Sequence, residues 1–146
     1  MKRLDDNSDL LKILRCAFET YNTLKPGYLE SVYEIALEHE LVDAGFSVRR
    51  QVRIPVIYKG IKLKKNFFAD GERTDRRSGL KPGARLAEAC DMIVDDHILL
   101  ELKAVAGLKP IHEKQLASYL KSTGMTEGML LNFGNLRRLE WRVFSP

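Results

Sequence analysis

Two acids and a lysine stand close together in one apolar stretch of the chain, at Asp91, Glu101 and Lys103. The residues between them indicate two short strands joined by a polar turn, so Glu101 and Lys103 must point to the same face of the second strand. Carboxylate oxygens are the ligands that a hard divalent cation prefers, and a neighbouring lysine can act on the water or phosphate that the cation activates. The trio therefore indicates a metal site, although taken alone an ordinary salt bridge on the strand explains it as well.

The pairing register of this hairpin decides whether the two acids can share a face. A two-residue turn would send Glu101 to the face opposite Asp91. A three-residue turn, Asp95-Asp96-His97, pairs Val94 with Ile98 and sets Asp91 across from Glu101. The metal hypothesis therefore predicts that odd-length turn or an equivalent bulge.

The remaining periodicity predicts the elements that must position this hairpin. Apolar residues recur with helical spacing up to residue 24, after a cap at Asn7 or Ser8, and again at about 28–44 and 110–122. Alternating or apolar runs predict strands at 46–58, 61–68, 127–133 and 139–144. The order helix, helix, hairpin, hairpin, helix, strand, strand is typical of an α/β or α+β domain with a central mixed sheet packed by helices.

The second helix carries a row of acids, Glu30, Glu34 and Glu38, at i, i+4 spacing. We expect Glu34 and Glu38 to form a solvated acidic face. Glu30 borders the apolar stripe at Tyr33 and Leu37, which leaves a functional role open for it.

Composition limits the class of protein. The chain has 146 residues, 45% hydrophobic and 30% charged, which suits one globular domain over 1–146. No apolar run is long enough to span a membrane and the first residues do not form a signal peptide, so we expect a cytoplasmic protein without membrane contact. Cys16 and Cys90 lack the spacing of a disulfide framework, and we expect reduced thiols.

Two surface segments stand out by composition. Seven basic residues and no acid lie between positions 49 and 65, and this run suits a polyanion; a solvated strand face is the alternative. Among them, nucleic-acid contacts are expected from Arg50, Arg53, Lys62 and Lys64. Residues 70–89 are polar, glycine-punctuated and without apolar periodicity, which predicts a loop inserted into the domain.

Several motifs occur together in one order along the chain. Gly27–Tyr33 reads GxxExxY, and residues 91–103 read D-x(9)-E-x-K. They are followed by His112-Glu113-Lys114-Gln115 leading to Tyr119, and by Leu131-Asn132-Phe133-Gly134. Together these motifs resemble the GxxExxY proteins, a branch of the PD-(D/E)XK nuclease superfamily, over about residues 9–143.

The resemblance implies a restriction-endonuclease-like core, a central mixed β-sheet flanked by helices. By its motifs, Asp91 and Glu101 look like the metal ligands for Mg²⁺ or Mn²⁺, Lys103 like the catalytic lysine, and Glu30 like a helix-borne acid that can join them. Asp70 is the alternative motif acid. We favour Asp91 because the expected strand and turn follow it directly.

The resemblance also implies which residues lie near the substrate and what the protein does. Gln115 and Tyr119 look like the QxxxY element of exonuclease-like members, which lies near the substrate strand, whereas His112 matches a position without an assigned role. The implied function is that of a metal-dependent nuclease that hydrolyses phosphodiester bonds, with DNA favoured over RNA as partner and a homodimer as one allowed assembly. The alternative is a non-catalytic nucleic-acid-binding or protein-interaction module that retains the nuclease fold.

Overall fold

The computed structural model describes residues 8–63 and 88–145. The chain divides into two compact units, residues 1–52 with 90–146 and residues 53–89, and each is described by itself. The insertion expected at 70–89 lies outside the described residues, except for its last two positions, which begin a strand.

The described chain contains three helices and seven strands, in the order expected from the sequence except that the first expected strand is divided in two. The helices are α1 (Asp9–Leu24), α2 (Glu30–Asp43) and α4 (Pro110–Thr123), and the strands are β1 (Val48–Ile54), β2 (Val56–Tyr58), β3 (Ile61–Leu63), β4 (Glu88–Val94), β5 (Ile98–Lys103), β6 (Glu127–Asn132) and β7 (Glu140–Phe144). Five strands form one sheet in the order β1-β4-β5-β6-β7, in which β5 and β6 are parallel while β4–β5 and β6–β7 are antiparallel. The predicted mixed sheet flanked by helices is confirmed.

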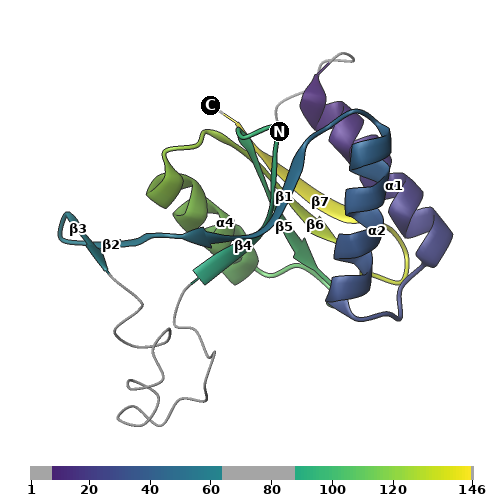
Figure 1. Ribbon diagram of the computed structural model, residues 1–146. Helices are drawn as coiled ribbons and strands as arrows, with labels where there is room; N and C mark the ends of the chain where they lie inside the picture. The colour runs from purple at the N-terminus through teal and green to yellow at the C-terminus, as the bar shows by residue number, and fades with distance from the viewer. Residues whose placement is uncertain (1–7, 64–87, 146) are drawn as a thin grey trace, which may run out of the picture. The chain divides into compact units, whose positions relative to one another are not determined.

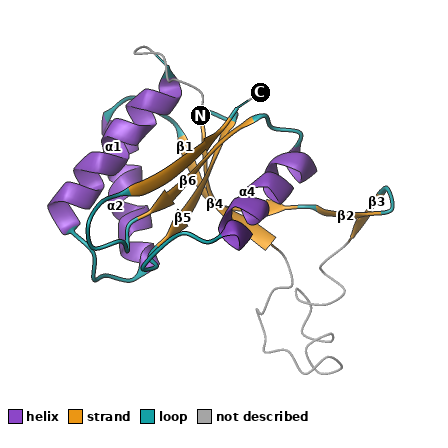
Figure 2. Cartoon of the chain, turned by 180° about the vertical axis from the view of Figure 1, so that it is seen from behind, coloured by secondary structure: helices purple, strands orange, loops and turns teal. Residues whose placement is uncertain are grey.

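The sheet separates two layers of helices. Figures 1 and 2 show α1 and α2 over one face and α4 over the other. Because side chains alternate along β5, Ile98, Leu100 and Leu102 join the buried cluster formed with α1 and α2. Glu101 and Lys103 therefore point toward the face that α4 covers. The strand thus contributes to the core with one set of residues and to the candidate site with the other.

Helix α4 packs closely on the sheet at a glycine of β6. A Cβ atom at Gly128 would lie 3.1 Å from the side chain of Leu116 and 3.2 Å from that of Leu120, both on α4. The helix begins at Pro110, which is suited to a first helical turn, and ends at Gly124 in the left-handed conformation (φ 74°). These signals fix the ends of the helix that faces the candidate site.

The turn between β4 and β5 has the predicted odd length. Val94 pairs with Ile98, so three residues form the turn. Asp95 and Asp96 have positive φ angles of 50° and 62°, a conformation that Asp tolerates better than most residues. The Asp95 carboxylate accepts hydrogen bonds from the backbone N–H of Ser47 at 2.8 Å and from its hydroxyl at 3.2 Å, which ties the turn to the start of β1.

The strand expected at 46–58 is instead interrupted. It divides into β1 and β2 at Pro55, because proline has no N–H to donate to a sheet ladder. Beyond this point β2 pairs with β3 in a separate two-stranded sheet around Lys59-Gly60.

The structure bears on two expectations drawn from composition, the state of the cysteines and the presence of a membrane-spanning helix. Cys16 and Cys90 are both free thiols. In the described part of the chain, no helix combines the length and the apolar character needed to cross a membrane.

Candidate active site

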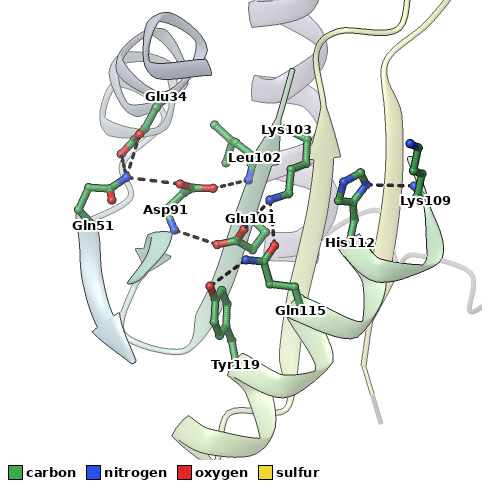
Figure 3. Close-up of polar contacts among 10 residues, drawn as sticks. All are labelled: Glu34, Gln51, Asp91, Glu101, Leu102, Lys103, Lys109, His112, Gln115 and Tyr119. Atoms are coloured by element: carbon green, nitrogen blue, oxygen red, sulfur yellow. Dashed lines mark hydrogen bonds and ion pairs between the residues drawn. The ribbon is translucent and has the colours of Figure 1, made fainter. Parts of the chain in front are cut away.

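Asp91 and Glu101 lie side by side on neighbouring strands in the interior of the protein. The register of β4 and β5, continued by one residue, sets Asp91 opposite Glu101, and they are 8% and 3% exposed. The N–H of Asp91 donates to Glu101 Oε1 at 3.2 Å, and the N–H of Leu102 donates to Asp91 Oδ2 at 2.6 Å (Figure 3). Backbone donors at the end of the ladder therefore hold both carboxylates in place.

The charged forms of both carboxylates are disfavoured. Burial and the charge of Asp91 together raise the pKa of Glu101 to about 8, against the opposing effect of the Lys103 charge. Burial likewise raises the pKa of Asp91, with the Leu102 N–H acting in the opposite direction and the charge of Glu34 adding to the rise. A pair of acids with raised pKa values is a site where a bound cation stabilises the charged forms.

Lys103 lies beside the acid pair and is fixed by α4. Its Nζ atom is 3.6 Å from Glu101 Oε2 and donates a hydrogen bond to Gln115 Oε1 at 2.8 Å. The Gln115 amide in turn donates to the Tyr119 hydroxyl at 3.0 Å. Gln115 and Tyr119 thus lie on one face of α4, and in this structure the pair orients the lysine. Tyr119 is only 4% exposed, and the contact of both residues with nucleic acid stays a prediction.

Glu30 is the first residue of α2 and is exposed. Partial desolvation raises its pKa, and the charges of Asp91 and Glu34 raise it further while Lys103 opposes the rise. The helix-borne acid is thus within electrostatic reach of the pair, as a residue that joins the site must be.

The expectation for Glu34 was wrong. Glu34 is 6% exposed, and both of its carboxylate oxygens accept hydrogen bonds from the Gln51 side-chain amide, at 3.0 and 3.1 Å. The same amide nitrogen lies 3.3 Å from Asp91 Oδ1, so Gln51 bridges the acid of α2 and the acid of β4 (Figure 3). Sequence reasoning missed Gln51 altogether. Glu34 comes one residue after Tyr33 and three before Leu37, and both of these residues lie in the core. This position in the helix could have indicated from the sequence that Glu34 is buried.

Arg50, one of the expected nucleic-acid contacts, is engaged within the protein. Its Nε lies 3.1 Å from the Glu38 carboxylate, and its guanidinium lies 4.0 Å from Glu34. Arg53 and Lys62 belong to the unit of residues 53–89, and Lys64 lies outside the described residues. Nucleic-acid contact by these four residues stays a prediction.

His112 has a structural part at the start of α4. Its Nδ1 accepts a hydrogen bond from the Lys109 N–H at 3.0 Å, and the His112 N–H donates to the Lys109 carbonyl at 2.9 Å. Partial burial lowers its pKa, and the nearby Lys103 and Lys109 lower it further. The neutral ring, with its proton on Nε2, therefore caps the helix that holds Gln115.

Two of the sequence motifs meet in the core beneath the site. Tyr33 of the GxxExxY motif stacks on Phe133, with ring centroids 5.0 Å apart and planes at 11°. The Tyr33 hydroxyl donates to the carbonyl of Lys25 at 2.6 Å and accepts from the N–H of Tyr28 at 3.1 Å. The tyrosine thereby fixes the loop that leads into Glu30.

Asn132 holds the segment that follows Lys103. It is fully buried, its Oδ1 accepts from the Val105 N–H at 2.9 Å, and its Nδ2 donates to the Val105 carbonyl at 2.8 Å and to Glu140 at 2.9 Å. Glu140 also accepts from the Leu108 N–H at 3.1 Å. The path of the chain away from the lysine is therefore fixed by the buried Asn132 amide and the half-buried Glu140 carboxylate.

The two carboxylates of the site suit a cation that keeps part of its water shell. Among residues 8–63 and 88–145, no group of three or more His, Cys, Asp or Glu side chains is arranged to hold a metal ion. Mg²⁺, however, is commonly bound by one or two carboxylates, several waters and substrate phosphate oxygens. Asp91 and Glu101 supply two buried carboxylates with raised pKa values, which fits that mode of binding.

Comparison with protein families matches residues 8–71 and 82–144 to the family described as the PD-(D/E)XK nuclease superfamily. The matched segments contain Glu30, Asp91, Glu101 and Lys103. No curated protein and no solved structure matches the chain significantly. The match is at the level of the superfamily, and the narrower resemblance to the GxxExxY branch stays a prediction.

Proposed function

Because the chain belongs to the PD-(D/E)XK nuclease superfamily, we propose that it is a metal-dependent nuclease that hydrolyses phosphodiester bonds in nucleic acid, with DNA the favoured substrate. The observation that carries the proposal is the arrangement of Asp91 opposite Glu101, with the Lys103 ammonium 3.6 Å from the second carboxylate. A salt bridge needed only for stability has no reason to include Asp91 as a second buried acid beside Glu101, because burying each further charge costs free energy.

Each residue has a distinct part in this proposal. When bound, Mg²⁺ or Mn²⁺ supplies positive charge that stabilises the anionic transition state and favours deprotonation of the attacking water. Asp91 and Glu101, in their charged forms, would hold the cation, and Glu30 at the start of α2 would join them. Lys103, oriented by Gln115, donates hydrogen bonds to the attacking water or to a phosphate oxygen as negative charge develops.

The test is cleavage of single- and double-stranded DNA and RNA in Mg²⁺ or Mn²⁺. We expect cation-dependent cleavage, with DNA the better substrate, and a loss of about 100-fold or more in Asp91→Ala and Lys103→Ala. Asp43→Ala and Lys114→Ala, which change exposed residues of the same types on α2 and α4, are the matched controls and should retain activity.

Two outcomes would contradict the proposal in different ways. Cleavage that survives both Asp91→Ala and Lys103→Ala would show that the site is elsewhere. Absence of cleavage of every substrate, with nucleic acid still bound in a fluorescence anisotropy titration, would favour the non-catalytic binding module.

A further inference from the structure

Gln51 has a backbone conformation that its residue type does not favour. It lies within β1 with a φ of 52°, in the left-handed region that non-glycine residues seldom adopt. Such conformations cost free energy and persist only where surrounding contacts maintain them. Inside a strand they interrupt the regular alternation and redirect a side chain.

The redirected side chain meets two buried acids. A side-chain amide has two N–H donors, and the Gln51 amide nitrogen has three carboxylate oxygens within reach: both oxygens of Glu34 and Oδ1 of Asp91. One N–H can therefore serve each acid. The amide places a neutral donor between two carboxylates that would otherwise repel each other in a desolvated environment.

The bridge completes the orientation of Asp91. The Leu102 N–H fixes Oδ2 at 2.6 Å, and Gln51 holds Oδ1 at 3.3 Å, so neither carboxylate oxygen can rotate without losing a bond. Glu34 lies one helical turn after Glu30, and its anchoring also fixes the start of α2 relative to the acid pair.

From this geometry we propose that Gln51 is a positioning residue, which locks the Asp91 carboxylate to α2 through Glu34 and thereby sets the affinity of the site for a divalent cation. The inference rests on the proposed function, because it takes Asp91 to be a metal ligand. Partners that orient a metal ligand commonly account for about 10- to 100-fold in metal affinity. Gln51 does not touch the reacting atoms in this proposal and acts only through Asp91.

The test is Mn²⁺ binding to the whole protein, measured by isothermal titration calorimetry and by electron paramagnetic resonance. Gln51→Gly removes the amide, and glycine adopts the left-handed conformation without strain. Gln51→Met keeps a side chain of similar length but removes both donors. We expect both variants to bind Mn²⁺ about 10- to 100-fold more weakly than the wild type.

A matched control separates the bridge from relief of strain. Lys59 has nearly the same φ, 51°, in the exposed turn between β2 and β3, and belongs to the unit of residues 53–89. Lys59→Gly relieves the same kind of strain and should bind Mn²⁺ as the wild type does. Circular dichroism at the temperature of the titration establishes that each variant is folded, so that a loss of affinity is not a loss of structure.

The outcomes distinguish this inference from the proposed function. Wild-type affinity in either folded Gln51 variant would overturn the positioning role while leaving the metal site intact. Two results would overturn the metal assignment and the positioning role with it. One is that the wild type does not bind Mn²⁺, and the other is that Asp91→Ala binds Mn²⁺ with the same affinity as the wild type.

Discussion

Replacing Glu101 with glutamine should stabilise the protein at high pH and leave it nearly unchanged at low pH. Burial raises the pKa of Glu101 from its usual 4.5 to about 8 in the folded state. Between these two values the unfolded chain has released the proton while the folded chain still binds it, so each increase in pH favours unfolding. The contribution of protonated Glu101 to the stability of the wild type is fully present below pH 4.5 and is lost as the pH rises through 8.

The size of the effect follows from the two pKa values. At about 1.36 kcal/mol for each pKa unit, the interval from 4.5 to about 8 gives an upper limit of about 5 kcal/mol. Solvent screening does not reduce this figure much, because Glu101 is only 3% exposed. Glutamine has the shape of the protonated acid and no charge to bury, so Glu101→Gln should escape most of this loss.

The assay is urea unfolding of the wild type and Glu101→Gln between pH 5 and pH 9. The two stabilities should nearly coincide at pH 5 and diverge by a few kcal/mol in favour of the variant at pH 8–9. At pH 8, Mg²⁺ at a hundred times its dissociation constant should stabilise the wild type by about 2.7 kcal/mol and the variant by much less. Glu113→Gln is the matched control, because Glu113 is solvated and pairs with Arg142 at the surface. Parallel curves for wild type and Glu101→Gln across this range would refute the reasoning.

Three further substitutions test the contacts that hold the site. Tyr33→Phe removes the hydroxyl that bonds the loop before α2 and should cost about 1 kcal/mol in urea unfolding; an unchanged free energy of unfolding would mean that water replaces those bonds. Gly134→Ala would bring a Cβ atom against the backbone just after β5. The free energy of unfolding should fall by roughly 1–3 kcal/mol, and the midpoint of thermal unfolding should fall with it. A midpoint equal to that of the wild type would contradict so close an approach. Gln115→Leu removes the acceptor that orients Lys103 and should lower kcat of the nuclease about 10- to 100-fold, whereas Ser118→Leu on the exposed side of α4 should not; equal rates would show that the lysine needs no such partner.

The geometry of the acid pair could be predicted because it depends on local rules. Strand alternation places Glu101 and Lys103 on one face, and a three-residue turn is the connection that brings Asp91 opposite Glu101. The ends of the helices were likewise predictable where a single residue decides them, as at Ser8, whose side chain accepts from the Leu11 N–H at 3.2 Å.

The bridge between the acids could not be predicted, because it depends on contacts between distant parts of the chain. The buried Glu34 carboxylate receives its donor from Gln51, 17 residues further along, whereas a row of acids at i, i+4 spacing is typical of a solvated helix face. Nothing in a glutamine within a run of alternating residues signals a positive φ. The partner of the buried acid and the backbone conformation of that partner thus both belong to a tertiary contact.

The turn at 95–97 has a consequence for how the gene can vary in length. One residue gained or lost there would exchange the two faces of β5, carrying Glu101 and Lys103 into the hydrophobic core and expelling Leu100 and Leu102 from it. Leu100 and Leu102 would move to the face that α4 covers, so the main cost would come from burying the Glu101 and Lys103 charges among apolar side chains, several kcal/mol for each charge. Insertions and deletions at this turn are therefore tolerated in pairs of residues or with a compensating bulge, and a single-codon change in length is more damaging there than most substitutions.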